Sequence, residues 1–182
     1  MIPLAVVGAV FAALPRLQGA AIHIHRYARL RRHGPNLYSG PGPGREVHAA
    51  TDIPRRVIVL DSGLRGRELR RILIHEVFHF AWVRLGNRRR GGWECLLANE
   101  IHAHARGELG WSAQFRKDEL TPEDVRGRSR RWRGYLCEAF CDTAACRWSG
   151  IAQHEEFTLS GRWRSRRFAW LDDAVADRPI PI

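Results

Sequence analysis

The stretch that most constrains the fold is RRILIHEVFHFAWVRLG, residues 70–86. It holds no proline, and its only glycine is the last residue, Gly86. Apolar residues recur at spacings of three and four from Leu69 to Ala81, the pattern of a helix with one buried face. The sequence therefore predicts one uninterrupted helix over residues 65–85, which Gly86-Asn87 ends.

The elements predicted around this helix define the fold class. Val57–Leu60 is apolar and mostly β-branched, and Asp61-Ser62-Gly63 follows it, which predicts a strand and a turn. Further helices are predicted over residues 91–110, from a Thr121 N-cap to Gly150 with a break near Gly127, and after Ser160. We therefore expect a small α+β fold, mostly helical, with a short sheet before the 65–85 helix.

The loop GPNLYSGPGPG, residues 34–44, predicts a boundary through which no regular structure runs. It divides an N-terminal arm and Pro/Gly loop, residues 1–44, from one domain over residues 45–182. The first fourteen residues are apolar, but they are shorter than the roughly 20 residues of a membrane span and lack a basic n-region. We expect a buried N-terminal segment or a start codon placed too early, with a signal or an anchor as the alternative.

The charge balance is only a weak indication of an acidic partner. The net charge is +11, and Lys117 is the only lysine among 30 basic residues. Such a bias toward arginine is typical of GC-rich genomes, and the arginines are spread along the chain. Nucleic acid is therefore a secondary expectation as a partner. The four cysteines form no CxxC pair, which favours reduced thiols in the cytoplasm.

His75-Glu76-Val77-Phe78-His79 is the chain's main chemical motif. On a helix His75 and His79 are one turn apart, so both imidazoles project from the same face and suit Zn²⁺. Glu76 leans toward the open side of such a metal, where it could take a proton from water. The alternative is a buried helix whose histidines bond to backbone or carboxylate groups.

A catalytic zinc site needs a third protein ligand from elsewhere in the chain. The metzincin pattern is excluded, because no histidine follows at the required spacing. Glu138 is the preferred candidate, because a carboxylate rarely occupies an apolar helix unless it is paired or binds a metal. Asp142, one turn later, could accept the outer N–H of a ligand histidine. Glu100 is the alternative, and the remaining candidates are Glu94, His102 and His104.

The pairing of His75-Glu76-x-x-His79 with a downstream Glu138-x-x-x-Asp142 helix resembles the gluzincin branch of the zincin metallopeptidases. In that branch the downstream Glu is the third zinc ligand and the Asp supports a histidine. The strand before the motif and the small size also resemble bacterial ImmA/IrrE-like metallopeptidases. The resemblance covers about residues 55–148. The gap between His79 and Glu138 is longer than in thermolysin-like members, which implies an inserted helix.

These observations lead to one preferred function and two alternatives. We expect a zinc metallopeptidase, a hydrolase of peptide bonds in a peptide or protein substrate, with Glu76 as general base. Tyr135 and His154 are candidate donors to the oxyanion of the transition state, and the Val57–Leu60 strand could pair its edge with an extended substrate. The alternatives are a DNA-linked regulatory protein that retains a zincin-like domain, and a metal-binding module without hydrolysis.

Overall fold

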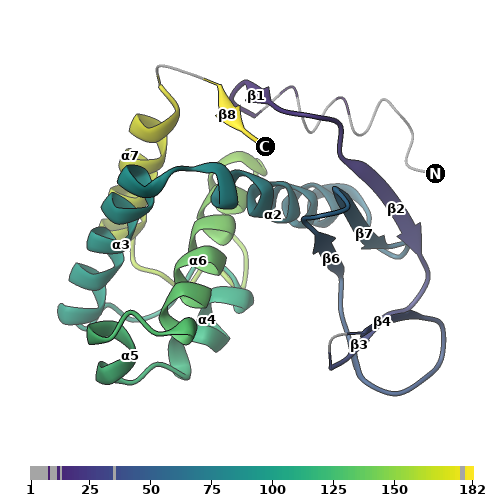
Figure 1. Ribbon diagram of the computed structural model, residues 1–182, viewed down its shortest axis with the longest axis horizontal. Coiled ribbons are helices and arrows are strands. Elements are labelled where there is room, and N and C mark those ends of the chain that lie inside the picture. The colour runs from purple at the N-terminus through teal and green to yellow at the C-terminus, as the bar shows by residue number, and fades with distance from the viewer. Residues whose placement is uncertain (1–7, 9–11, 13, 35, 177–178) are drawn as a thin grey trace.

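Helix α2, Gly66–Arg84, crosses the middle of the molecule and carries the His75–His79 motif (Figure 1). The computed structural model describes residues 8, 12, 14–34, 36–176 and 179–182. The bounds of α2 confirm the predicted helix to within a residue at either end. Its apolar face is completely buried at Ile74, Val77 and Phe78. Helix α6, Arg130–Trp148, packs along α2 and completes the core there.

The main sheet lies beside α2 and has the strand order β2-β7-β6. Strand β7, Val57–Asp61, confirms the predicted strand. It lies in the middle of the sheet, between β2, His23–Tyr27, which runs parallel to it, and β6, Ala49–Asp52, which runs antiparallel. The expectation that the Val57–Leu60 strand offers a free edge is therefore wrong, because both its edges are paired. Strands β2 and β6 are the edge strands of this sheet.

The N-terminal third of the chain contains more strand than the sequence indicated. Strands β3, Leu30–His33, β4, Asn36–Ser39, and β5, Arg45–Glu46, form a second small sheet in the order β4-β3-β5. Strand β4 lies inside residues 34–44, so the prediction of no regular structure there is wrong. Strand β2 belongs to the predicted N-terminal arm, and its five residues pair with β7 in the main sheet.

The two ends of the chain meet in a two-stranded sheet. Strand β1, Leu17–Gln18, runs parallel to β8, Ile180–Pro181, and Ile180 is buried. The apolar segment 1–14 lies outside the described residues except at positions 8, 12 and 14, so its expected burial stays a prediction.

The helical half of the molecule differs from the prediction in one place that matters for the site. Helix α3, Asn87–His102, ends well before Gly110. A loop with positive φ at His104 and Gly107 then leads into α4, Trp111–Asp118, which the sequence did not indicate. The loop takes the place of residues 103–110 of the predicted 91–110 helix, and α4 begins only after that predicted helix should have ended.

The remaining helices follow their local signals. The Thr121 side chain and Asp124 form a capping box at the start of α5, Pro122–Arg126, and the predicted break at Gly127 separates α5 from α6. Helix α7, Gly161–Val175, is longer than the short helix expected after Ser160. The elements together form the expected α+β fold. Among the described residues, no helix has the length and apolar character needed to span a bilayer.

Candidate metal centre

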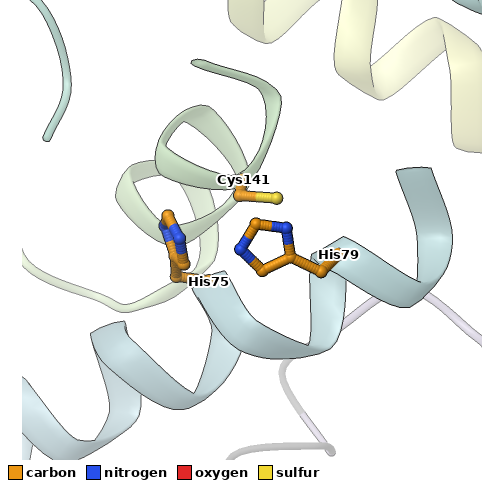
Figure 2. A group of neighbouring side chains, drawn as sticks. All are labelled: His75, His79 and Cys141. Atoms are coloured by element: carbon orange, nitrogen blue, oxygen red, sulfur yellow. The ribbon is translucent and has the colours of Figure 1, made fainter. Parts of the chain in front are cut away.

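His75 and His79 project from α2 toward α6, with their ring centroids 4.9 Å apart (Figure 2). Both imidazoles are largely buried, with side-chain exposures of 9% and 18%. Glu138 reaches them from α6: its Oε2 lies 3.3 Å from His75 Nε2 and 3.9 Å from His79 Nε2. The structure therefore brings the three predicted ligands together, although Glu138 lies far along the chain from both histidines.

Asp142 contacts the second ring nitrogen of His75, Nδ1. Its Oδ1 lies 2.7 Å from His75 Nδ1, and its Oδ2 accepts a hydrogen bond from the Ala113 N–H of α4 at 2.9 Å. A proton on Nδ1 for this hydrogen bond leaves Nε2 free to bind a metal, which is the usual arrangement around a ligand histidine. The close approach of α4 depends on Gly110, where an added Cβ would lie 2.2 Å from the Asp142 carboxylate carbon.

The electrostatics of this cluster attract a cation. Burial opposes a charged His75, but the charge and hydrogen bond of Asp142 and the hydrogen bond of Glu138 raise its pKa well above the ordinary value. Burial alone would likewise raise the pKa of Glu138, yet the hydrogen bond and charge of His75, helped by the charges of His79 and Arg116, lower it to about 2. A proton on His75 Nε2 and a metal ion bound to that nitrogen would take the same place, between Nε2 and the Glu138 carboxylate.

Two of the three donor–donor distances in the set of His75, His79 and Glu138 are close to those of a zinc site. Bonds of about 2.0–2.1 Å in a tetrahedral site place neighbouring donor atoms roughly 3.3–3.4 Å apart. The His75–Glu138 distance already has this value, and the His79–Glu138 distance exceeds it by about half an ångström. Arg116 of α4 lies 3.4 Å from Oε1 of Glu138 and so leaves Oε2 to face the imidazoles.

Cys141 offers a second donor set with the same histidines. Its sulfur and one nitrogen from each of His75 and His79 lie within 4.8 Å of one another, a group that could hold a metal ion (Figure 2). Cys141 is completely buried, however, and burial raises the pKa of its thiol well above the ordinary value. The neighbouring Cys137 contacts His79 Nδ1 at 3.4 Å. We favour the Glu138 set for chemistry on a substrate, because Glu138 lines an open cleft and Cys141 does not.

That cleft has a volume of about 610 Å³ and contains every residue of the Glu138 set. It is lined by residues from strands β5 and β6 on one side and by residues from helices α2, α4 and α6 on the other. Glu76 also lines it, so the predicted base faces the same space as the predicted ligands. A metal held by His75, His79 and Glu138 would therefore be accessible to a substrate in the cleft.

Glu76 is held in place by strand β6. The Thr51 hydroxyl lies 2.6 Å from Oε2 of Glu76 and 3.3 Å from its backbone oxygen. No hydrogen bond from the described residues reaches Oε1 of Glu76, so this oxygen is available to a molecule in the cleft. Because a hydroxyl donor fixes one carboxylate oxygen, the other can accept a proton in a defined direction.

Two other predicted residues, Tyr135 and Glu100, lie in a separate cluster that is closed to solvent. Arg167 of α7 is completely buried and pairs with Glu100 Oε2 and Glu108 Oε2, each at 2.6 Å. The Tyr135 hydroxyl donates to Glu108 at 2.7 Å, and Lys117 lies 3.1 Å from the same carboxylate. The structure therefore brings neither Tyr135 to the cleft as an oxyanion donor nor Glu100 to the histidines as a ligand.

His154 also lies outside the cleft lining. Its Nε2 is 3.1 Å from Glu68 Oε1, in a group that includes the buried Arg71 and Glu156. Arg71 and Glu156 line the cleft, whereas His154 lies behind them. The remaining candidates, Glu94, His102 and His104, are not among the lining residues either.

Sequence reasoning missed Thr51, Gly110, Ala113 and Arg116. Gly110 directly precedes α4, and Ala113 and Arg116 belong to it. No side-chain hydrogen bond caps the start of this helix. The only local signal was Gly110 directly before an aromatic residue, and it does not indicate a contact with Asp142. Thr51 lies in a strand of four residues, too short to show a period.

A scan of protein-family models, a search of curated proteins and a search of solved structures each found no match to this chain.

Proposed function

We propose that this protein is a zinc-dependent metallopeptidase of the zincin type that hydrolyses peptide bonds. The single observation that carries the proposal is the convergence of His75, His79 and Glu138 in one cleft, with Glu76 beside them. Two imidazoles and one carboxylate form a known ligand set of catalytic zinc, which keeps its fourth position open. When bound, the zinc ion would polarise the scissile carbonyl and lower the pKa of a water molecule toward 7.

The side chains of the cleft would then perform separate tasks. His75, His79 and Glu138 would hold the metal, and Asp142 would keep the His75 ring in orientation through its Nδ1. Glu76, fixed by Thr51, would take the proton from the attacking water and deliver it to the leaving amine. Arg116 lines the cleft beside Glu138, and its guanidinium would stabilise negative charge that develops on the carbonyl oxygen.

The free edge of β6 supports a polypeptide as the substrate. The N–H of Asp61 donates to the His48 oxygen at 2.8 Å, so alternate residues of β6 direct their backbone groups toward β7. Ala49 and Thr51 are the residues between, and their N–H and C=O groups point away from β7. Both residues line the cleft. An extended peptide can pair with such an edge through its own backbone, which recognises a chain regardless of its sequence.

The cysteine usage supports a reducing compartment. All four cysteines are free, and Cys137 and Cys141 lie next to the candidate centre. We therefore propose the cytoplasm as the location of the protein.

The proposal is tested by hydrolysis of an unfolded protein substrate such as casein. Zinc-loaded wild type should cleave it, a zinc chelator should stop cleavage, and added Zn²⁺ should restore it. Glu76→Gln should lower the rate roughly 10²- to 10⁴-fold while the protein keeps its zinc, because only the base is lost. The exposed Glu155→Gln serves as the matched control. Cleavage that persists in Glu76→Gln, or no cleavage by zinc-loaded wild type, would contradict the proposal.

A DNA-linked regulatory role is the second proposal, supported by the net charge of +11. Binding of this kind would weaken steeply with salt, because arginines that neutralise phosphates release counterions from the nucleic acid. It would also survive Glu76→Gln, which leaves the basic surface unchanged. Salt titration of binding to duplex DNA with both proteins therefore separates the two functions.

A further inference from the structure

The cleft has an aromatic wall that the proposed chemistry does not use. Trp111 and Phe115 lie one turn apart on α4, with their rings stacked at a centroid distance of 6.2 Å and an angle of 25°. They are 41% and 59% exposed, and both line the cleft that contains the candidate metal centre. Among the described residues only Tyr27, Tyr38 and Val83 are other large apolar side chains with this degree of exposure, and none of them lines the cleft.

The position of this aromatic pair is fixed by contacts with the centre itself. Ala113, on the opposite side of α4, is completely buried and donates its N–H to Asp142. The N–H of Trp111 donates to Glu156 at 2.9 Å, and Arg116 contacts Glu138. The hydrogen bonds that support the predicted ligands thus also orient the two rings toward the cleft.

The cleft also offers small and apolar partners for these rings. Ala49 and Ala50 of β6, Ile53 after it and Ile72 of α2 line the same cleft. The charged residues of the lining, apart from those of the centre, include Arg32, Arg45 and Glu46 of β3 and β5. The space beside β6 therefore combines a free backbone edge with an apolar surface, and a polypeptide with a large apolar side chain fits both.

We propose that Trp111 and Phe115 form a subsite that receives an aromatic or long aliphatic side chain of the substrate polypeptide. This inference rests on the proposed peptidase function and specifies its substrate class. Phe115 is adjacent to Arg116, which contacts Glu138, and one helical turn spans about 5.4 Å. The aromatic pair and the candidate centre line one cleft, so the bound side chain belongs to a residue close to the bond that is cut.

The first measurement compares two fluorogenic peptides that differ at one position, Phe against Ala, on either side of a single cleavable bond. Removal of a large apolar side chain from water favours binding enough for a roughly 10- to 100-fold higher kcat/KM with Phe. The double variant Trp111→Ala/Phe115→Ala should reduce this ratio to within about 3-fold. Tyr38→Ala, an exposed aromatic residue outside the cleft, should keep the wild-type ratio. A double variant that keeps the ratio would overturn the proposal, and so would an equal loss in Tyr38→Ala.

The second measurement separates this proposal from the peptidase function. Glu76→Gln protein, with and without the aromatic substitutions, is titrated into dye-labelled forms of the same two peptides, and fluorescence anisotropy reports binding. We expect tighter binding of the Phe peptide that the aromatic substitutions abolish, whether or not wild type cleaves. Equal affinity for both peptides would overturn the subsite even if cleavage occurs. A wild-type dimer in sedimentation that the double variant loses would assign the rings to contact between two copies and would also overturn it.

Discussion

Helix α6 contributes to two clusters of carboxylates, one closed and one open, which obtain their balancing positive charge from different sources. In the closed cluster, Arg167 and Lys117 carry two positive charges against the two negative charges of Glu100 and Glu108. In the open cluster, Glu76, Glu138 and Asp142 face two imidazoles, and Arg116 at the surface is the only guanidinium among the described residues that contacts them. Within the described part of the chain the open cluster therefore has no buried permanent cation, and a proton or a metal ion has to supply the charge.

This difference explains why local sequence could not separate Glu100 from Glu138. Each is a glutamate within a partly apolar helix, and each was a reasonable third ligand. The decision depends on the partner that the fold brings to it: Arg167 for Glu100 and His75 for Glu138, both distant along the chain. A carboxylate paired with a guanidinium is a structural ion pair, whereas one that faces two imidazoles is a candidate metal ligand.

The largest expected effect comes from removing the cation of the closed cluster. Arg167→Met leaves Glu100 and Glu108 buried without their principal partner, which should lower the free energy of unfolding by about 3–5 kcal/mol. The exposed Arg166→Met should change it by less than about 0.5 kcal/mol. Urea unfolding measures both. If Arg167→Met unfolds like wild type, the closed cluster does not hold the fold together as described.

A smaller effect is expected where α4 meets the open cluster. Gly110→Ala places a methyl group against the Asp142 carboxylate, and the resulting shift should cost about 1–3 kcal/mol in unfolding and weaken metal binding. The matched control is Gly91→Ala in α3, where a Cβ meets nothing within 4 Å and should stabilise the helix by up to about 1 kcal/mol. Equal behaviour of the two variants in urea would contradict the close approach of α4.

The next effect concerns metal affinity alone. Asp142→Asn removes the charge that fixes His75, and we expect zinc affinity to fall about 10- to 100-fold. Glu100→Gln makes the same chemical change in the closed cluster and should leave zinc affinity unchanged. Competition with a zinc-binding dye measures both affinities. A loss of similar size in Glu100→Gln would show that the two clusters are not independent.

The smallest effect is a pH dependence of stability in the metal-free protein. The pKa of His75 is raised in the folded protein. Its contribution to the free energy of unfolding is therefore fully present below its unfolded pKa near 6.5, and it is lost as the pH rises through the folded pKa. The pKa of Glu138 is lowered to about 2, so its contribution is complete above about 4.5 and is lost as pH falls toward 2. The open cluster should therefore stabilise the metal-free protein most between about pH 4.5 and 6.5.

Thermal unfolding in the presence of a chelator tests this window. In chelator, Glu138→Gln should lose the decline in stability on the acid side. Wild type measured separately with saturating zinc and no chelator should lose the decline on the alkaline side, because the metal then replaces the proton. If the unfolding temperature of wild type in chelator still rises from pH 6.5 to pH 8.5, the result contradicts the raised pKa of His75.

How far the sequence predicts this protein depends on the range of the signal. The 65–85 helix, the Thr121 cap and the spacing of Glu138 and Asp142 are local patterns, and the structure has these elements where they were expected. Helix α4 and strand β6 are short and depend on tertiary contacts, with Asp142 and with β7, that no local pattern contains. These two elements supply much of the cleft lining, so the residues of the open cluster were easier to predict than the space around them.

We propose that His75, His79 and Glu138 hold one metal ion, and metal analysis of purified protein decides whether they do. Wild type dialysed against buffered Zn²⁺ should carry close to one equivalent of zinc. Glu138→Ala and His79→Ala should carry far less, and Cys141→Ala should match wild type. A wild type without stoichiometric zinc would contradict the claim. Full occupancy in Glu138→Ala, with loss in Cys141→Ala, would move the third ligand from the open cleft to the buried sulfur.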